Sequence, residues 1–262
     1  MMNTHSALLP ATPAGMDDAE WALRLELAAC YRLFDWLGWA ELIFNHITAR
    51  VERPEGADPH YLINPFGLHY AEVTASSLVK IDLQGKVQDA STHPVNAAGF
   101  VIHSAVHAVR PDAHCIMHVH TTAGCAVSCK ESGLRHDNFY SAMMYGDIGY
   151  HAYEGVTTSL DEQPRLIASL GSANHLILRN HGLLAVGPEI PTAFNRLWTL
   201  QRACEIQLAS DAGAGGNTQI AVDILERVPA TRLGANTGRA ATNRLAFEAM
   251  LRRAGIDRHA LA

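Results

Sequence analysis

The 262-residue sequence lacks the features that would assign it to several large functional classes. No apolar run approaches the roughly 18 residues that a membrane-spanning helix needs. Lys and Arg never cluster beyond two adjacent residues and the net charge is −6, so the electrostatic signature of nucleic-acid or anionic-membrane binding is missing. There is no G-x-G-x-x-G sequence and no P-loop, which argues against a nucleotide-binding fold. We therefore expect no nucleic-acid partner and no membrane association.

The N-terminus and the cysteines also lack the patterns of exported proteins. Residues 1–16 have no cationic start followed by an apolar block, and their Pro, Ala and Thr content predicts a flexible arm. The 5 Cys residues are an odd number without framework spacing, which favours reduced thiols over disulfides. Cys125 and Cys129 could be metal ligands, but the apolar Ala126 and Val127 between them favour a packing role. These features predict a cytoplasmic protein.

The sequence does contain apolar residues in regular patterns. Hydrophobic residues make up 48% and charged residues 18%, a balance that supports a large buried core. Apolar periodicity and caps predict helices over residues 17–37, 96–109 and 243–253, around 194–208, and from a cap at Asp161 to Gly171. Strands are predicted over residues 47–51, 61–63, 78–82 and 113–120, with two more around the turn Asn180-His181-Gly182. The order predicts a mixed α and β fold without regular βαβ repeats.

Two segments stand out among the 15 histidines. His118 and His120 end an apolar strand, and residues two apart on a strand point to the same face. Both imidazoles could therefore meet one ion at the about 2.0–2.1 Å of a zinc–nitrogen bond. His181, in its tight turn, could project into the same cleft as a third ligand. The plainer interpretations are half-exposed strand histidines and a loop histidine bonded to its own backbone.

The segments Arg110–His120 and Leu178–Leu184 resemble the two metal-binding motifs of the class II aldolase/adducin family. The resemblance runs from about Ala19 to Ala209 and includes Asn45 with Thr48 at the family's early Gly-Asn-x-Ser position. It implies that His118, His120 and His181 hold one divalent metal, with zinc preferred over manganese or iron. It also implies that Asn45 and Gly67 contact the substrate.

The same resemblance implies an architecture. We expect a three-layer α/β fold with a central, mainly antiparallel sheet flanked by helices. The metal-binding domain would cover residues 17–210, and residues 211–262 would form a linker and a C-terminal helical tail. Family members are commonly cyclic tetramers with the active site at a subunit boundary, so a homo-oligomer and a small-molecule substrate are expected.

The sequence departs from the sugar-phosphate aldolases of this family. Those enzymes place a proton-transferring acid 19 residues before the first motif histidine, where this chain has Gly99, and there is no Asp or Glu between Val95 and Val109. Their phosphate-binding hydroxyl residues correspond to Ala97, Ala98 and Phe66, which cannot cradle an anion. The segments 95–105 and 149–155 are more similar to the adducin-like branch. A phosphorylated sugar is therefore not expected as the substrate.

Four other residues could supply the missing acid–base function. His151, Tyr153 and Glu154 form a titratable cluster after an aromatic-rich stretch, and His103 lies one helical turn beyond Gly99. The plainer interpretations are packing roles for His151 and Tyr153, a solvated charge for Glu154 and a buried structural histidine at 103.

Two functions of different classes fit these patterns. The first is a divalent-metal-dependent C–C lyase of aldolase or decarboxylase type, acting on a small non-phosphorylated carbonyl or carboxylate compound. The second is a non-catalytic adducin-like binding or scaffold protein with a structural metal. A non-haem iron site is a further possibility, because three histidines also suit Fe(II).

Overall fold

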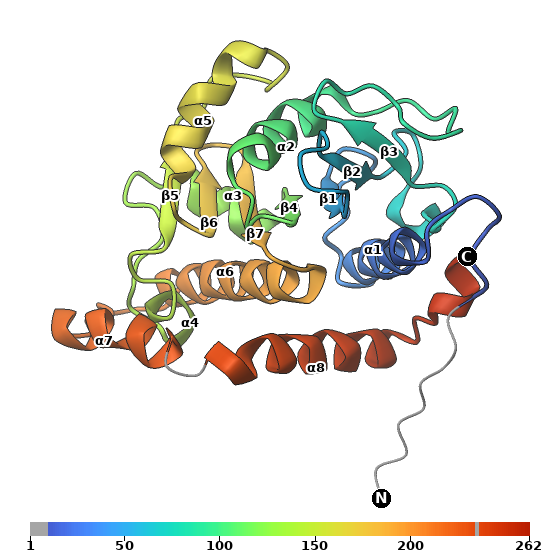
Figure 1. The fold of residues 1–262 in the computed structure, drawn as a ribbon. Helices are drawn as coiled ribbons and strands as arrows, with labels where there is room; N and C mark the ends of the chain where they lie inside the picture. Colours follow the sequence, from blue (N-terminus) through green and yellow to red (C-terminus); the bar gives the residue numbers. More distant parts are fainter. Residues whose placement is uncertain (1–9, 234–235) are drawn as a thin grey trace, which may run out of the picture.

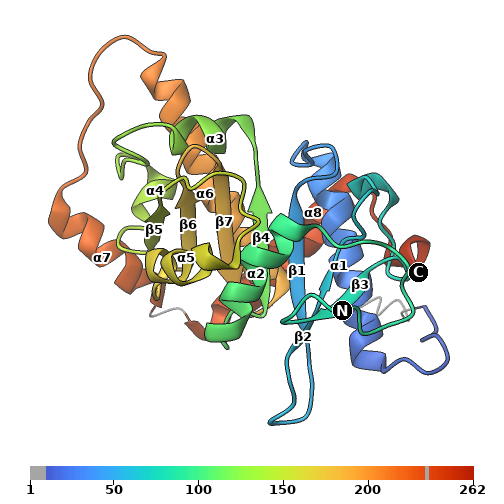
Figure 2. The ribbon, with the colours of Figure 1, turned by 90° about the horizontal axis from the view of Figure 1, so that it is seen from above.

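The computed structural model describes residues 10–233 and 236–262, so most of the predicted N-terminal arm lies outside the described residues. One mainly antiparallel sheet forms the centre of the molecule (Figures 1 and 2). Its strands are β1 (His46–Val51), β2 (His60–Ile63), β3 (Val79–Asp82), β4 (Cys115–Val119), β5 (Ile148–His151), β6 (His175–Leu178) and β7 (Gly182–Gly187). They lie in the order β3-β2-β1-β4-β7-β6-β5, and all neighbours are antiparallel except β5 and β6.

Helices cover both faces of this sheet (Figure 1). On one face lie α2 (Ala97–Val109) and α5 (Gln163–Leu170). On the other face lie α1 (Asp18–Trp36) and α6 (Ile190–Asp211), and α8 (Asn236–Ala254) packs on α6. The other helices are α3 (Thr122–Ser128), α4 (Phe139–Ala142) and α7 (Val222–Leu233), with 3-10 turns at Tyr70–Glu72, Leu160–Glu162 and Arg258–Leu261. The expected three-layer α/β fold is confirmed.

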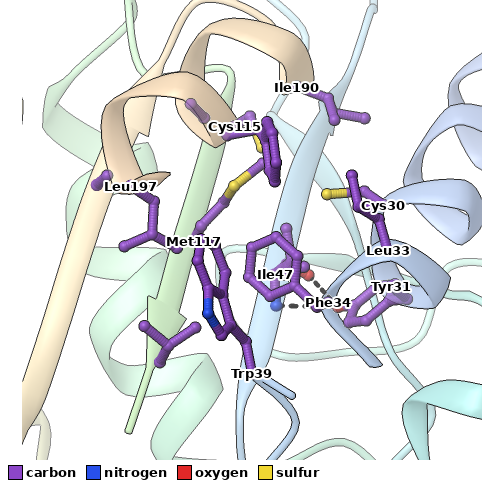
Figure 3. Close-up of a cluster of buried hydrophobic side chains, with 14 of the residues drawn as sticks. Cys30, Tyr31, Leu33, Phe34, Trp39, Ile47, Cys115, Met117, Ile190 and Leu197 are labelled. Atoms are coloured by element: carbon purple, nitrogen blue, oxygen red, sulfur yellow. Dashed lines mark hydrogen bonds between the residues drawn. The ribbon is translucent and has the colours of Figure 1, made fainter. Parts of the chain in front are cut away.

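Two apolar layers hold β1 and β4 in place. The larger lies between the sheet and helices α1, α6 and α8, and Figure 3 shows part of it, including Phe34, Ile47 and Met117. In this layer the hydroxyl of Tyr31 donates to the carbonyl of Ile47 and accepts from its N–H at 2.9 Å. The second layer, under α2 and α5, includes Ile116 of β4. Apolar burial therefore fixes β4 on both faces and β1 on the face toward α1 and α6.

The C-terminal segment packs on the same core as the sheet. Phe247 and Leu251 of α8 are buried with Phe194 of α6, and the carbonyl of Leu261 accepts from the N–H of Ala75 at 2.7 Å. The expected division of the chain at residue 211 stays a prediction. Among the described residues, no helix has both the length and the apolar content to cross a bilayer.

Several predicted elements differ from the observed ones. Ser159, not Asp161, caps the segment that leads into α5. Its side chain accepts from the N–H of Asp161, and the 3-10 turn begins at the next residue, Leu160. Helix α8 begins at Asn236, seven residues before the predicted start at Asn243. Strand β5 and helices α3, α4 and α7 were not predicted, since they are short or lack a strong apolar period.

Candidate metal centre

Three histidines meet at one end of the sheet, where β4 ends and β7 begins. One ring nitrogen from each of His118, His120 and His181 lies within 4.8 Å of the others. The Nε2 atoms of His118 and His120 are 2.7 Å apart. The ring centroid of His181 lies 4.8 Å from those of both other rings. The structure thus brings together the three residues that the sequence predicted as ligands, which we call the histidine cluster.

The turn between β6 and β7 holds His181 against the other two rings. Asn180 has a left-handed backbone with φ of 57°, a conformation that asparagine tolerates better than most residues. A Cβ added at Gly182 would lie 2.4 Å from the carbonyl oxygen of Val119, so only glycine permits this close approach. The thiol of Cys125 on α3 donates to the carbonyl of His181 at 2.9 Å. Turn geometry and close backbone packing therefore position this ring.

The hydrogen bonds and burial of the cluster suit metal binding. Nδ1 of His118 lies 2.9 Å from the carbonyl oxygen of Leu183, and a carbonyl only accepts, so Nδ1 carries the hydrogen and Nε2 presents a lone pair. Burial, and then the neighbouring imidazoles, hold the pKa of His118 well below its usual value. The same causes lower the pKa of His181 to about 4, and burial lowers that of His120. Neutral imidazoles are the form that binds a divalent metal. Three of them within reach of one point fit zinc or a similar ion.

His46 fills the space beside Gly99, the position that the resemblance matches to the acid of the sugar-phosphate aldolases. A Cβ added at Gly99 would lie 2.8 Å from Cδ2 of His46. His46 on β1 is paired directly opposite His118 on β4, and the two ring centroids are 5.0 Å apart. Burial, followed by His103 and the cluster histidines, holds the pKa of His46 well below its usual value. No sequence pattern indicated this residue, because only the pairing of β1 with β4 brings it to the cluster.

His103, a predicted acid–base candidate, reaches the cluster only through His46. Its Nε2 lies 2.9 Å from Nδ1 of His46, and its Nδ1 lies 2.7 Å from the hydroxyl oxygen of Thr48. Nε2 of His107 lies 2.8 Å from the same oxygen. Burial lowers the pKa of both histidines, that of His107 to about 3. These residues form a buried polar line behind His46.

The other three candidates lie beside His181. His151, Tyr153 and Glu154 line one small pocket together with His181 and Glu162. Glu154 is paired with Arg165, whose Nε lies 2.8 Å from its carboxylate, and Tyr153 is 55% exposed. His151 is buried, with Nε2 3.1 Å from Oε1 of Glu162. No local sequence pattern marks Glu162, which a loop and a 3-10 turn bring beside His151.

The two predicted substrate-binding residues differ in their surroundings. Asn45 is buried and donates from Nδ2 to the carbonyl of Trp39 at 2.7 Å, and its Oδ1 has no partner among the described residues. Gly67 is exposed, with φ of 105° and nothing within 4 Å of an added Cβ. Their contacts with a substrate stay a prediction.

A larger cavity of about 530 Å³ lies elsewhere on the molecule. Residues such as Glu26 and Arg244 line it, and the histidine cluster does not.

Comparisons with known proteins agree with this geometry. Residues 25–208 match the class II aldolase and adducin N-terminal domain. A Pseudomonas aeruginosa protein, named only provisionally as an aldolase class 2 protein, is 48% identical over 226 residues, which cover 86% of this chain and 85% of that protein. Mouse alpha-adducin is 50% identical over 203 residues, 76% of this chain but only 27% of the adducin.

The fold is also found in a solved enzyme structure. An L-fuculose 1-phosphate aldolase from Glaciozyma antarctica is 30% identical, with a TM-score of 0.78 over 94% of this chain and 95% of that chain. The matching domain, the close relatives and the shared fold agree with one another. The chain therefore belongs to the class II aldolase and adducin family.

Proposed function

We propose that the protein is a divalent-metal-dependent lyase that cleaves a carbon–carbon bond, by aldol or decarboxylation chemistry, in a small non-phosphorylated carbonyl or carboxylate compound. The observation that carries this proposal is the convergence of His118, His120 and His181 as neutral imidazoles. These residues would hold the ion, zinc being the first choice and manganese or iron the alternatives. A divalent ion there polarises a substrate oxygen and stabilises the negative charge that C–C cleavage leaves.

The surroundings of α2 support a substrate without phosphate. Ala97 and Ala98 stand in its first turn, so their methyl groups replace hydroxyl donors. The ring of Phe66 lies 6.4 Å from that of Phe44, next to the N-terminus of the same helix, whose Asn96 donates to the carbonyl of Phe44. Removing a phosphate from water in such surroundings would be costly without polar partners.

Glu162 and His151 are the pair that we propose for proton transfer. The carboxylate accepts from Nε2 of His151, and the hydroxyl of Ser169 lies 3.0 Å from Nδ1, so both ring nitrogens of this histidine are occupied. The hydroxyl of Thr157 also donates to Oε1 of Glu162, at 3.2 Å, whereas Oε2 has no hydrogen-bond partner among the described residues. Glu162 would therefore exchange the proton, with His151 orienting it. Tyr153 and Glu154 stay candidates at the pocket rim.

Replacing Glu162 with Gln tests this assignment. Turnover is expected to fall by about 10²–10⁴-fold, the usual contribution of a positioned acid or base, while the metal content stays unchanged. Asp161→Asn, on the same 3-10 turn but exposed to solvent, is the matched control and should keep most activity. Kinetics and metal analysis on both variants decide the matter. Full turnover in Glu162→Gln would contradict the assignment.

A second function is favoured by the identity with alpha-adducin, which is 50% over this domain. In this alternative the histidine cluster holds a structural metal, and the protein acts as a binding or scaffold protein. The chain spans about a quarter of the adducin's length.

Removing the metal separates the two functions. Protein purified without added ions is analysed for metals, stripped with EDTA, and then supplied with zinc, manganese or iron(II). Turnover is followed by NMR on a panel of 2-keto acids, hydroxy acids and hydroxyaldehydes. For a lyase, turnover on an accepted substrate disappears with the metal and returns when the metal is restored. A scaffold protein turns over no compound in either form, and chelation lowers only its unfolding temperature.

A further inference from the structure

A cavity of about 200 Å³ lies between the C-terminal end of α1 and helix α6. Its lining residues are Leu37, Trp39, Trp198, Gln201, Arg202 and Glu205. We propose that this cavity binds a small uncharged aromatic compound, and that the indole N–H of Trp39 donates a hydrogen bond to a carbonyl oxygen of this ligand. None of the three cluster histidines lines the cavity, so the site is separate from the proposed catalytic centre and goes beyond the proposed function.

Aromatic rings form much of the wall of this cavity. The ring centroids of Trp39 and Trp198 are 5.8 Å apart. Phe34 and Phe194 pack on Trp39, with centroid distances of 5.2 and 6.2 Å, and Figure 3 shows Trp39 beside Phe34 in the buried layer. Aromatic side chains favour other flat rings, which meet them stacked or edge to face. Because a cavity of roughly 150 Å³ can already hold benzene, this one has room for a single ring with a short substituent.

The side chain of Trp39 has one polar group, the indole N–H, and this group is unpaired. Only 6% of the residue is exposed, and its indole nitrogen makes no hydrogen bond with a described residue. That nitrogen is nevertheless not among the unpaired side-chain atoms that are fully enclosed by the described residues. Since the ring is otherwise packed against aromatic side chains, we infer that its N–H reaches open space in the cavity. A buried tryptophan usually has a hydrogen-bond acceptor, and here a ligand can supply it.

The other polar side chains of the wall are already paired. The amide oxygen of Gln201 accepts from the hydroxyl of Thr121 at 2.5 Å, and its nitrogen donates to Oε1 of Glu205 at 2.9 Å. Oε2 of Glu205 lies 2.8 Å from a guanidinium nitrogen of Arg202, which stands over the ring of Trp198. The two opposite charges cancel, and each side-chain acceptor atom has a donor. The cavity therefore offers a free donor without a net charge, which matches an uncharged ligand that carries an acceptor oxygen.

Acetophenone and ethylbenzene test the hydrogen bond, because they have the same ring and the same carbon count and differ in the carbonyl oxygen. The protein is labelled with ¹⁵N-tryptophan and freed of metal with EDTA, so that no carbonyl can bind an ion at the histidine cluster. The 4 Trp residues give four indole signals, and that of Trp39 is the one lost in Trp39→Phe. Acetophenone should move this signal further downfield than ethylbenzene does. Equal shifts with the two compounds would contradict the hydrogen bond.

The affinities of the two compounds for Trp39→Phe measure the contribution of the N–H. This variant keeps an aromatic ring but has no donor. The affinity for acetophenone, divided by that for ethylbenzene, should fall by about 3- to 10-fold, the loss expected for one neutral hydrogen bond. Ethylbenzene corrects for the change in cavity shape. An unchanged ratio would overturn the role of Trp39.

Trp36→Phe is the matched control. Trp36 has the guanidinium of Arg253 over its ring at 5.3 Å, much as Trp198 has that of Arg202 at 5.4 Å. It is 45% exposed, however, and does not line the cavity. This variant should bind both compounds like the wild type. A loss equal to that of Trp39→Phe would show that the ligand does not occupy this cavity.

Leu37→Trp covers the case in which Trp39→Phe does not fold. Leu37 is half-buried on the cavity wall, so a larger ring there takes up part of the space and should weaken both compounds by about 10-fold or more. Full affinity in this variant would place the compounds elsewhere.

Three results with the wild type would also overturn the proposal. If a second copy of the chain covers the cavity, neither compound binds. If acetophenone binds only after zinc is added, the ligand lies at the histidine cluster. Benzoate should bind more weakly than acetophenone, because its charge would lose water without gaining an unpaired cation, and a preference for benzoate would contradict an uncharged ligand. The proposed function is tested apart from all of these, since they follow no turnover and the binding site contains no metal.

Discussion

Replacing His118 with alanine is expected to remove the bound divalent ion and turnover together. His118 is the most buried member of the histidine cluster, and its ring is oriented by the bond from Nδ1 to the carbonyl of Leu183. Loss of a supporting hydrogen bond alone typically weakens metal binding by about 10–100-fold, so loss of the ligand itself should cost more. Metal content and turnover of the purified variant are the measurements.

His175→Ala is the matched control for this variant. His175 is equally buried, on β6 of the same sheet, but its Nδ1 is bonded to the carbonyl of Asp147, 2.9 Å away, and it is not part of the cluster. Both substitutions remove a buried ring and should lower stability, whereas only His118→Ala should lose the metal. A His118→Ala protein that keeps a full equivalent of zinc would show that the cluster is not the binding site.

Local sequence patterns were enough for most of the helices and for part of the cluster. Helices α1, α2 and α6 carry a clear apolar period, and the side chains of Asp17 and Asn96 cap the first two. The approach of His118 to His120 follows from strand spacing, which is a local pattern. His181 meets these two rings only because β7 pairs with β4, so the resemblance to the family was needed to connect it with them.

The surroundings of the cluster depend on contacts between distant segments. His46 reaches His118 because β1 pairs with β4 in one register, and a shift by one residue would turn its side chain to the other face. Glu162 reaches His151 because a loop folds back over β5. No spacing within one segment encodes either contact. The absence of an acid at Gly99 was visible in the sequence, but the ring that occupies its place was not.

The same buried histidines should make the metal-free protein sensitive to acid. In the unfolded chain a histidine has a pKa of about 6.5, whereas burial lowers the pKa of His107 to about 3 and that of His181 to about 4 in the folded state. Between the pKa of the unfolded chain and the lower pKa of the folded state, the unfolded chain binds more protons than the folded protein. Stability is therefore full above about pH 6.5 and falls as the pH is lowered, until the folded-state pKa is reached.

In this pH window, each fully buried histidine that stays neutral lowers the free energy of unfolding by up to about 1.4 kcal/mol for every pH unit of acidification. Unfolding of the metal-free protein by heat or urea, measured from pH 7.5 to pH 4, should show this loss. His107→Phe keeps a ring against Tyr61, 4.7 Å away in the native protein, but cannot take up a proton. The unfolding free energy of this variant should fall less steeply with decreasing pH than that of the wild type. The difference between the two slopes should correspond to about one proton taken up on unfolding. Equal slopes would mean that burial does not keep His107 neutral in the folded protein.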